Sequence, residues 1–454
     1  MEVREEDTRA ESRRDLSDAG VKDPVVAFHA LLQDERLAAD SAQALADGQR
    51  EKQLMFGERP LCVALRPQLL TRRRFEQAVS AAEGVASALS ALEKAVLDDA
   101  VLRAELALES EEERLAMADP GFRFSSPSVR LDSFFADQVR FVEYNAESPA
   151  GMAYSDNLTE VFKRLPVMQA FRKRFRGKFM PTRRRQLSAM LGAFKQWGKS
   201  TTPVIAIVDW EGLPTAPEFE MFKAFFEEAG IRTLICDPRT LEFTRGKLHS
   251  QGTAVNLVYR RVLTSELLAR GDDTRALRDA YMAGAVCVVN SFRAKLLHKK
   301  MSLALLSDER YERLYTPAQR AAVRRHIPWT RQVRPELAED IARRRQTLVL
   351  KPNDEYGGKG VVLGWTVDQA EWEAAIDVAT RQSYVVQEAV EIPRVPFPIA
   401  LDGIRYLDLA VDLDPYLFNG RAGGFMTRVS AAALLNVTAG AGSVVPTFVV
   451  EGPA

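Results

Sequence analysis

The sequence predicts an α+β fold, and three features of the chain support this prediction. A region rich in Ala, Leu and Glu, from about residue 24 to residue 108, has the apolar periodicity of packed helices. Residues 203–237 alternate strand, helix and strand, as a parallel βαβ unit requires. After residue 347, short apolar strands alternate with glycine-containing turns. With 454 residues, the chain is long enough for two or three structural units.

The composition narrows the class of protein. Hydrophobic residues make up 46% of the chain and charged residues 27%, which is ordinary for a globular protein. The 62 basic and 62 acidic residues cancel, so net charge does not favour nucleic acid or a membrane surface as a partner. No apolar run is long enough to span a membrane, and the stretch MEVREEDTRAESRRD lacks the apolar core of a signal peptide. We therefore expect a cytoplasmic protein without a membrane partner.

The cysteines agree with this expectation. Cys62, Cys236 and Cys287 are scattered along the chain, and each is flanked by apolar residues. They show no C-x-x-C spacing, so they predict buried reduced thiols and not disulfides or a zinc site.

The N-terminal part of the chain looks structural. Residues 1–23 are polar and predict a disordered arm. Residues 24–120 predict a helical region that contains the long periodic stretch SAAEGVASALSALEKAVLDDAVLRAELAL. No residue type in this region demands a chemical role.

The stretch from Val129 to Gly151, within a segment predicted at 121–195, carries the first candidate site. VRFVEYN predicts a strand, on which Glu143 and Asn145 share a face because they are two residues apart. The same spacing relates Arg130 and Asp132 in VRLD. Carboxylate and amide oxygens suit Mg²⁺, and an arginine beside them suits a phosphate. The alternative, from this stretch alone, is a salt-bridged surface hairpin.

A basic tract follows a predicted helix at about residues 156–164. Its cationic residues are Arg172, Lys173, Arg174, Arg176, Lys178, Arg183, Arg184 and Arg185. Such a tract is either a nucleic-acid or phosphate patch or, more commonly, a solvated helix face or linker. The interleaved Phe171, Phe175 and Phe179 favour a helix docked by its apolar side.

Residues 196–290 predict a Rossmann-like unit. PVIAIVDW, IRTLICD and VNLVYRR are apolar strands, and PEFEMFKAFFEEAG is an amphipathic helix that ends in glycine. The unit lacks a G-x-G-x-x-G sequence, so a dinucleotide site is not favoured.

The last segment, residues 291–454, predicts a glycine flap. A strand end and a helix carry Lys295, Lys299 and Lys300, and the strand TLVLKP ends on Lys351. NDEYGGKG then leads into the strand GVVLGW, so the two strands enclose a glycine loop. Its glycines allow backbone N–H groups close to an anion, although tight turns also use glycine for steric reasons. They are Gly357, Gly358 and Gly360. The loop is not a Walker A loop, because Lys359 is followed by glycine.

Taken together, four stretches in this order resemble the circularly permuted branch of the ATP-grasp superfamily. They are the R-x-D and E-x-N pair, HKKMSLALL, LVLKPNDEYGGKGVV and VVQEAV. The order is similar to that of the glutathionylspermidine synthase type. EYNAESPAG, VVNSFRAKLLHKK, IPWTR and NVTAGAG also resemble an uncharacterised bacterial group of permuted ATP-grasp proteins. The resemblance runs from about residue 55 to the end of the chain.

The resemblance implies a set of site residues. Two lysines would bind the ATP phosphates: Lys351 and, in preference to Lys299, Lys300. The loop of Gly357, Gly358 and Gly360 would cover the phosphates. Magnesium would be held by Asp132, Glu143 and Asn145. Arg130 would stabilise the transferring phosphoryl group, and Arg428 is either a second phosphate contact or part of a structural ion pair. The adenine would lie against the strand end formed by Gln387, Glu388, Ala389 and Val390.

Two details of the resemblance bear on the substrates. Glu147, Ser148 and Gly151 follow the metal ligands and would face the carboxylate substrate. The glycine loop departs from a basic or glycine-only pattern, because it carries Asp354 and Glu355.

The implied activity is that of an ATP-dependent, Mg²⁺-dependent ligase. Such an enzyme joins a carboxylate, small or peptidic, to an amine or thiol through an acyl phosphate, with lysines and Mg²⁺ neutralising the transferred group. The alternatives are a phosphotransferase that stops at phosphoryl transfer and a non-catalytic nucleotide-binding scaffold whose basic tract meets a partner. Nucleic acid is not an expected partner.

Overall fold

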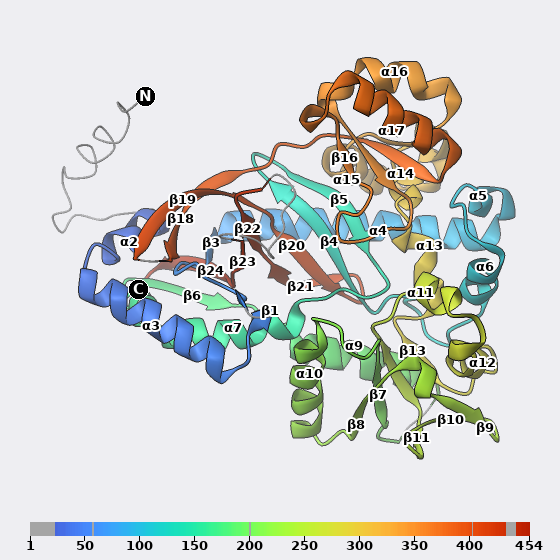
Figure 1. Cartoon of the computed structure of the whole chain (residues 1–454), viewed down its shortest axis with the longest axis horizontal. Helices are drawn as coiled ribbons and strands as arrows, with labels where there is room; N and C mark the ends of the chain where they lie inside the picture. The colour runs from blue at the N-terminus through green and yellow to red at the C-terminus, as the bar shows by residue number, and fades with distance from the viewer. Residues whose placement is uncertain (1–22, 57–58, 199–200, 402, 433–441) are drawn as a thin grey trace.

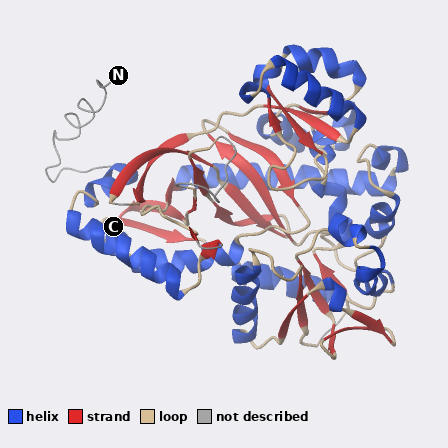
Figure 2. Cartoon of the chain, in the orientation of Figure 1, coloured by secondary structure: helices blue, strands red, loops and turns tan. Residues whose placement is uncertain are grey.

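The computed structural model describes residues 23–56, 59–198, 201–401, 403–432 and 442–454. The described chain contains both helices and strands, and its last part, from β17 to β24, is made of strands alone, which fits the α+β prediction (Figure 2). In Figure 1, the unit that contains α16 and α17 and the unit that contains β7 and β8 lie at opposite ends of the molecule, with β4 and β5 between them. The predicted arm up to residue 22 and nearly all of NVTAGAG lie outside the described residues.

The N-terminal region is helical, as predicted, but three short strands interrupt it. Its helices are α2 (Pro24–Leu31), α3 (Glu35–Glu51), α4 (Arg72–Asp98), α5 (Ala100–Ala104) and α6 (Ser110–Met117). The strands are β1 (Met55–Phe56), β2 (Arg59–Pro60) and β3 (Gln68–Thr71). The side chain of Thr71 caps α4 by accepting a hydrogen bond from the N–H of Arg74. The sequence could not reveal β3, because its partner is the last strand of the chain.

The central sheet carries the R-x-D and E-x-N residues. It has the order β21–β20–β4–β5 and is antiparallel, with its apolar face packed on α4. Its strands are β4 (Ser128–Phe135), β5 (Val139–Asn145), β20 (Asp414–Phe418) and β21 (Arg421–Met426). The register of β4 and β5 shifts after Asp132, because Asp132 pairs with Glu143 whereas Ser133 pairs with Phe141. Val142 is the extra residue of this bulge.

Two further sheets and three helices complete the central body. One sheet has the order β18–β19–β22–β23, and the other has the order β3–β24–β6. These strands are β6 (Phe175–Phe179), β18 (Arg394–Ala400), β19 (Ile404–Val411), β22 (Arg428–Ser430), β23 (Ser443–Val444) and β24 (Thr447–Pro453). The helices are α7 (Met152–Arg164), α8 (Pro166–Arg172) and α9 (Arg183–Gln196).

The basic tract does not form the single docked helix that its phenylalanines suggested. Phe171 lies in α8, whereas Phe175 and Phe179 lie in β6, which pairs with β24. Gly177 allows this pairing, because a Cβ there would lie 2.3 Å from the carbonyl oxygen of Val449. The sequence pattern failed here because the pairing partner is distant in the chain.

The Rossmann-like prediction of parallel strands is confirmed. The sheet has the order β13–β12–β7–β8, and every pairing in it is parallel. Its strands are β7 (Ile205–Val208), β8 (Thr233–Cys236), β12 (Leu257–Arg260) and β13 (Cys287–Val289). Its helices are α10 (Ala216–Glu228), α11 (Thr264–Ala269) and α12 (Arg275–Met282). A small antiparallel sheet of β9 (Glu242–Thr244), β10 (Lys247–Ser250) and β11 (Thr253–Val255) is appended to it.

The predicted glycine flap is also confirmed as an antiparallel strand pair. β15 (Leu348–Pro352) pairs with β16 (Val362–Leu363), and the flap sheet has the order β14–β17–β15–β16. Its other strands are β14 (Thr330–Gln332) and β17 (Tyr384–Glu388). The helices of this part are α13 (Lys295–His298), α14 (Met301–Leu306), α15 (Pro317–His326), α16 (Ala338–Arg343) and α17 (Gln369–Arg381). α16 and α17 cover one face of the sheet around Trp372.

One predicted helix is broken at the lysines. α13 ends at His298 and α14 begins at Met301, so Lys299 and Lys300 lie between two short helices and not within one. Lys299 has an extended backbone, with ψ of 136°, which ends α13. The break turns the two neighbouring lysines toward different surroundings.

The three cysteines are buried and free, as their apolar flanks predicted. Burial raises the pKa of the Cys236 thiol to about 11. None of the described helices combines the length and the apolar character that crossing a membrane would need.

Candidate functional site

The register of β4 and β5 brings the R-x-D and E-x-N residues onto one face. Arg130 pairs with Asn145, and Asp132 pairs with Glu143. Directly paired residues of an antiparallel sheet point to the same side, so all four side chains gather together. The sequence predicted the spacing within each strand, and the pairing of the strands supplies the convergence.

Asp132 lies at the centre of this group. Its carboxylate accepts two hydrogen bonds from the Arg130 guanidinium, at 2.7 and 3.0 Å. It also accepts one from Nδ2 of Asn145 at 2.8 Å and one from Arg428 at 2.9 Å. Burial by itself would raise the pKa of Asp132, but the charges of Arg130 and Arg428 outweigh burial and hold the pKa at about 2.

Two aspartates that the sequence reasoning missed complete the group. Arg428 donates to Asp412 at 2.5 Å and to Asp414 at 3.0 Å. Both carboxylates are buried, and burial, with the charges of Asp132 and Asp412, raises the pKa of Asp414 well above its usual value. The available signal was the D-x-D spacing in VDLDP, which predicts two aspartates on one side of an extended stretch.

Lys300 and Lys299 differ in what they contact. Nζ of Lys300 lies 3.0 Å from Oε1 of Glu143, so Lys300 joins the predicted metal ligands. Nζ of Lys299 lies 2.7 Å from Oε2 of Glu112 and 2.7 Å from the carbonyl oxygen of Ala107. Lys299 therefore binds residues of the N-terminal helical region and does not contact Glu143.

Lys351 approaches the same group from the flap sheet. Its Nζ donates to the carbonyl oxygen of Val142 at 3.1 Å and to Oε1 of Gln387 at 2.6 Å. The bulge in β5 frees this carbonyl, because the extra residue of a bulge leaves the regular ladder. Burial and the charge of Lys300 lower the pKa of Lys351 to about 8, although Glu143 opposes the shift. Gln387 is held in turn by Thr330, at 2.9 Å.

The predicted adenine residues lie at the end of β17. The side chain of Glu388 pairs with Arg344 at 2.9 Å, and that of Gln387 bonds Lys351, so both side chains have partners within the protein. The N–H groups of Glu388 and Ala389 donate to the carbonyls of Trp329 and Thr347. The N–H of Val390 makes no hydrogen bond within the described ranges. Of these three N–H groups, only that of Val390 is therefore available to a ligand.

The glycine loop, residues 353–361, has the backbone that its glycines predicted. Gly357, Gly358 and Gly360 all have positive φ, between 64° and 78°. The two acids of the loop are matched by lysines: Asp354 lies 2.6 Å from Nζ of Lys295, and Glu355 lies 3.1 Å from Nζ of Lys359. The carboxylates that departed from the expected pattern are therefore neutralised within the protein.

One expectation about the substrate side is wrong. Glu147 is fully buried, 2.9 Å from Arg260 and 3.4 Å from Lys295, so its carboxylate holds the structure together and does not face a substrate. Gly151 donates its N–H to Glu218, and the positive φ of 97° at this residue lets the chain turn into α7. Ser148 is half-buried beside them.

The donor set fits Mg²⁺ that arrives with a nucleotide. Within the described residues, no three His, Cys, Asp or Glu side chains gather as a ready-made metal cage. Mg²⁺ is commonly held by one or two carboxylates together with phosphates and water, so a complete protein cage is not needed. Glu143, with a quarter of its side chain exposed, and Oδ1 of Asn145, opposite the Nδ2 that bonds Asp132, are the oxygens best placed for it.

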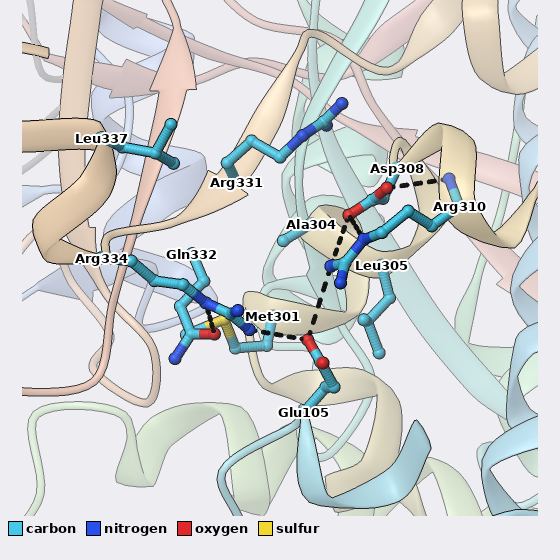
Figure 3. Close-up of a pocket in the computed structure, with 10 residues that line it drawn as sticks. All are labelled: Glu105, Met301, Ala304, Leu305, Asp308, Arg310, Arg331, Gln332, Arg334 and Leu337. Atoms are coloured by element: carbon cyan, nitrogen blue, oxygen red, sulfur yellow. Dashed lines mark hydrogen bonds and ion pairs between the residues drawn. The ribbon is translucent and has the colours of Figure 1, made fainter. Parts of the chain in front are cut away.

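A cavity of about 260 Å³ lies outside this group, where α14 meets β14 (Figure 3). The acidic residues that line it form ion pairs with arginines of the same lining: Glu105 with Arg334 at 3.0 Å and Asp308 with Arg310 at 2.8 Å. Glu105 follows α5 and Arg334 follows β14, so the ion pair between them connects the N-terminal helices to the flap sheet.

Comparisons with known proteins support the fold and leave the activity open. No protein family model matches the chain, and a search of curated proteins finds no match. A solved glutathione synthetase-like effector from Globodera pallida is similar, with a TM-score of 0.60 and 13% identity over 92% of this chain and 99% of that chain. A protein from Methylobacillus flagellatus KT, provisionally named gamma-glutamylcysteine synthetase, covers 77% of this chain and 83% of its own, with a TM-score of 0.40 and 10% identity. The chain therefore has the fold of the glutathione synthetase-like effector, which it matches over nearly the whole length of both chains.

Proposed function

We propose that the protein is an ATP-dependent, Mg²⁺-dependent ligase that joins a carboxylate to an amine or thiol through an acyl phosphate. The observation that carries this proposal is the environment of Lys351. Its ammonium group is surrounded by neutral acceptors, the oxygens of Val142 and Gln387, and makes no ion pair with the part of the chain described here. A partly buried cation whose hydrogen bonds go only to neutral oxygens favours an anion, and a nucleotide phosphate would supply one.

Neighbouring cations extend the proposed phosphate site. Lys300 lies beside Glu143, and Arg130 and Arg428 both bind Asp132. We propose that Lys351 and Lys300 bind the phosphates near the adenosine, while the two arginines face the phosphoryl group that is transferred. Cationic groups that are already in position when the reaction begins stabilise the developing negative charge without having to reorganise. Asp412 and Asp414 act as positioning residues, because they hold the Arg428 guanidinium.

The nucleotide would lie between the flap sheet and the central sheet. Lys351 of β15 already contacts Val142 of β5, so the two sheets meet at this point. The N–H of Val390 would donate to the adenine, and the glycine loop would cover the phosphates. Mg²⁺ held by Asp132, Glu143 and Asn145 would neutralise phosphate charge and align the γ-phosphoryl group.

The proposed reaction has two steps. A substrate carboxylate oxygen attacks the γ-phosphorus of ATP, the bond to the β-phosphate oxygen breaks, and ADP leaves as the acyl phosphate forms. An amine nitrogen then attacks the acyl carbon, phosphate leaves, and the nitrogen loses a proton to solvent or to a basic group. The name of the Globodera pallida protein, a glutathione synthetase-like effector, agrees with peptide-bond chemistry of this kind.

The test is a search for ADP and phosphate release from ATP with pools of carboxylates and amines, with and without Mg²⁺. Hydroxylamine in place of the amine should trap the acyl phosphate as a hydroxamate. Lys351→Met should abolish turnover, whereas Lys247→Met, which removes an exposed lysine of β10, should not.

Other outcomes would contradict the ligase proposal. AMP as the product would exclude an acyl phosphate route. A phosphorylated product that accumulates in the presence of amine would indicate a phosphotransferase. ATP binding without turnover on any mixture would indicate a nucleotide-binding scaffold.

A further inference from the structure

The basic tract lines a cavity that the proposed ligase activity does not use. The cavity has a volume of about 490 Å³ and lies between α7, β6, the start of α9, α10 and β24. This volume is in the range of small-molecule sites. The cavity contains none of the residues proposed to bind the nucleotide or Mg²⁺.

Positive charge exceeds negative charge around the cavity. The cationic side chains that line it are Lys163, Arg172, Lys178, Arg183 and Arg184. The acidic side chains that line it are Asp156 and Glu160.

Both acidic side chains already have hydrogen-bond or ion-pair partners within the protein. Asp156 is buried and accepts hydrogen bonds from the backbone N–H and hydroxyl of Thr182, at 2.9 Å each, and from the backbone N–H of Arg183, also at 2.9 Å. Its remaining contact is with Nε of Arg183, at 3.3 Å. Glu160 pairs with Lys163 at 2.8 Å. Neither acid is therefore left to repel an incoming anion without compensation.

Two of the cations have no such match. The side chains of Arg172 and Arg184 make no hydrogen bond or ion pair with any residue in the described ranges. Lys178 pairs only with Glu451 at the surface, where both side chains are about half exposed and such pairs are weak. Each guanidinium presents five donors, so two facing one cavity can hold an anion with several acceptor oxygens.

The lining of the cavity is also partly aromatic. Phe179 and Phe448 pack edge to face with ring centroids 4.9 Å apart, and the guanidinium of Arg183 lies 5.0 Å from the ring centroid of Phe225. All three phenylalanines line the cavity. Aromatic faces favour an apolar or planar group, and the stacked Arg183 extends that surface.

The cavity is connected to the proposed nucleotide site through α7. Asp156 lies in the second turn of α7, about 7.5 Å of helix rise from Gly151, which follows the E-x-N strand. Phe225, which also lines the cavity, shares α10 with Glu218, whose carboxylate accepts the N–H of Gly151. A ligand in the cavity would therefore contact the two helices that fix Gly151, which lies six residues beyond the end of β5.

We propose that this cavity binds a small organic anion that has at least two negative charges and an aromatic or apolar body. Arg172 and Arg184 bind the charged oxygens, and the three phenylalanines with Arg183 contact the body. An organic phosphate and an aromatic polycarboxylate share this chemistry. The limited volume of the cavity and the chain's net charge of zero favour a small ligand over a nucleic acid.

The test is calorimetric titration of the full chain, without ATP or Mg²⁺, so it is independent of the ligase proposal. The probes are phenyl phosphate, benzene-1,3,5-tricarboxylate and inorganic phosphate. At least one aromatic anion should bind, and inorganic phosphate should bind about tenfold more weakly because it lacks the apolar body. Whichever aromatic probe binds more tightly shows whether the site prefers phosphate or carboxylate groups.

The variants locate the binding. Arg172→Gln combined with Arg184→Gln should lower the affinity for the tighter-binding aromatic probe by about tenfold or more, because charge-assisted hydrogen bonds are lost. Lys173→Gln combined with Arg174→Gln removes the same charge from exposed residues of the same tract that do not line the cavity, and should leave binding within about twofold. All four residues are exposed, so both variants should fold, which their melting temperatures will verify.

Three results would overturn the proposal. The first is the absence of binding by either aromatic anion at about 10 mM. The second is equal weakening by the two double variants, which would indicate a diffuse charge effect. The third is tighter binding of a single-stranded oligonucleotide that both double variants weaken equally, which would indicate a nucleic-acid surface.

Discussion

Lys300 Nζ lies 3.0 Å from Oε1 of Glu143, so the helix break at the lysines is tied directly to β5 of the central sheet. The charge of Lys300 outweighs the effect of burial and lowers the pKa of Glu143. The carboxylate is therefore ionised at neutral pH, as the Mg²⁺ site proposed above requires.

Neighbouring lysines should have separable effects. Lys300→Met should weaken ATP binding by about ten- to a hundredfold, because a charge-assisted contact is lost. Lys299→Met should instead destabilise the protein by about 1–3 kcal/mol, because buried Glu112 loses the closer of its two cations and keeps only Lys295. ATP titration and thermal melting of both variants measure the two effects. Weaker ATP binding in the Lys299 variant at an unchanged melting temperature would contradict this assignment.

ATP affinity should depend on pH through Lys351. Its pKa of about 8 means that the ligand-free protein loses this proton as pH rises through 8, whereas a bound phosphate favours the charged form. The dissociation constant for a non-hydrolysable ATP analogue should therefore rise above about pH 8, by at most about tenfold per pH unit. Titrations from about pH 7.5 to about pH 9.5 check this. Lys351→Arg should flatten the dependence, and an equally steep profile in that variant would assign the proton to another group.

Gly360 and Gly246 form a matched pair for the glycine loop. Both have φ of +70°, but a Cβ at Gly360 would lie 2.7 Å from Cγ of Pro352, whereas the space around Gly246 is open. Gly→Ala at either position should cost about 1 kcal/mol of stability from the left-handed backbone. Only Gly360→Ala should also weaken ATP binding, because its loop must move. Equal ATP affinity in the two variants would show that the loop does not contact the nucleotide.

Lys295 should be essential for stability. It is fully buried and lies within 3.4 Å of carboxylate oxygens of Glu112, Glu147 and Asp354. Lys295→Met should lower the free energy of unfolding by about 3–5 kcal/mol, because three carboxylates lose a shared cation. Arg36→Met, which removes an exposed contact to Asp40, should change it by less than about 0.5 kcal/mol. Urea denaturation of both variants provides the comparison, and similar losses would contradict the importance of the buried cluster.

The local patterns of the sequence predicted the elements well. Alternation in VRFVEYN placed Glu143 and Asn145 on one face, and β5 has that form. The strand, helix, strand order of residues 203–237 predicted parallel pairing, which β7 and β8 show. Such features depend on neighbours in the chain, so a single sequence contains them.

Contacts between distant segments were not predictable in the same way. The helical appearance of HKKMSLALL gave no sign that Lys299 would reach Glu112 while Lys300 would reach Glu143. The acidic residues of the glycine loop looked unfavourable for phosphate until the structure placed Lys295 beside Asp354. Glu147 was expected near a substrate, but Arg260 from the parallel sheet buries it.

Local periodicity was enough to predict strands such as β5, β7 and β8 and the faces of their chemical side chains, but not β3 or β6, whose pairing partner is distant in the chain. Which charges meet depends on the tertiary structure. The bulge at Val142, the break between α13 and α14, and the joining of Asp412 and Asp414 to Arg428 depend on strand register and packing. Electrostatic contacts fall off over a few ångströms, so the positions of distant segments determine which cations remain free for a ligand.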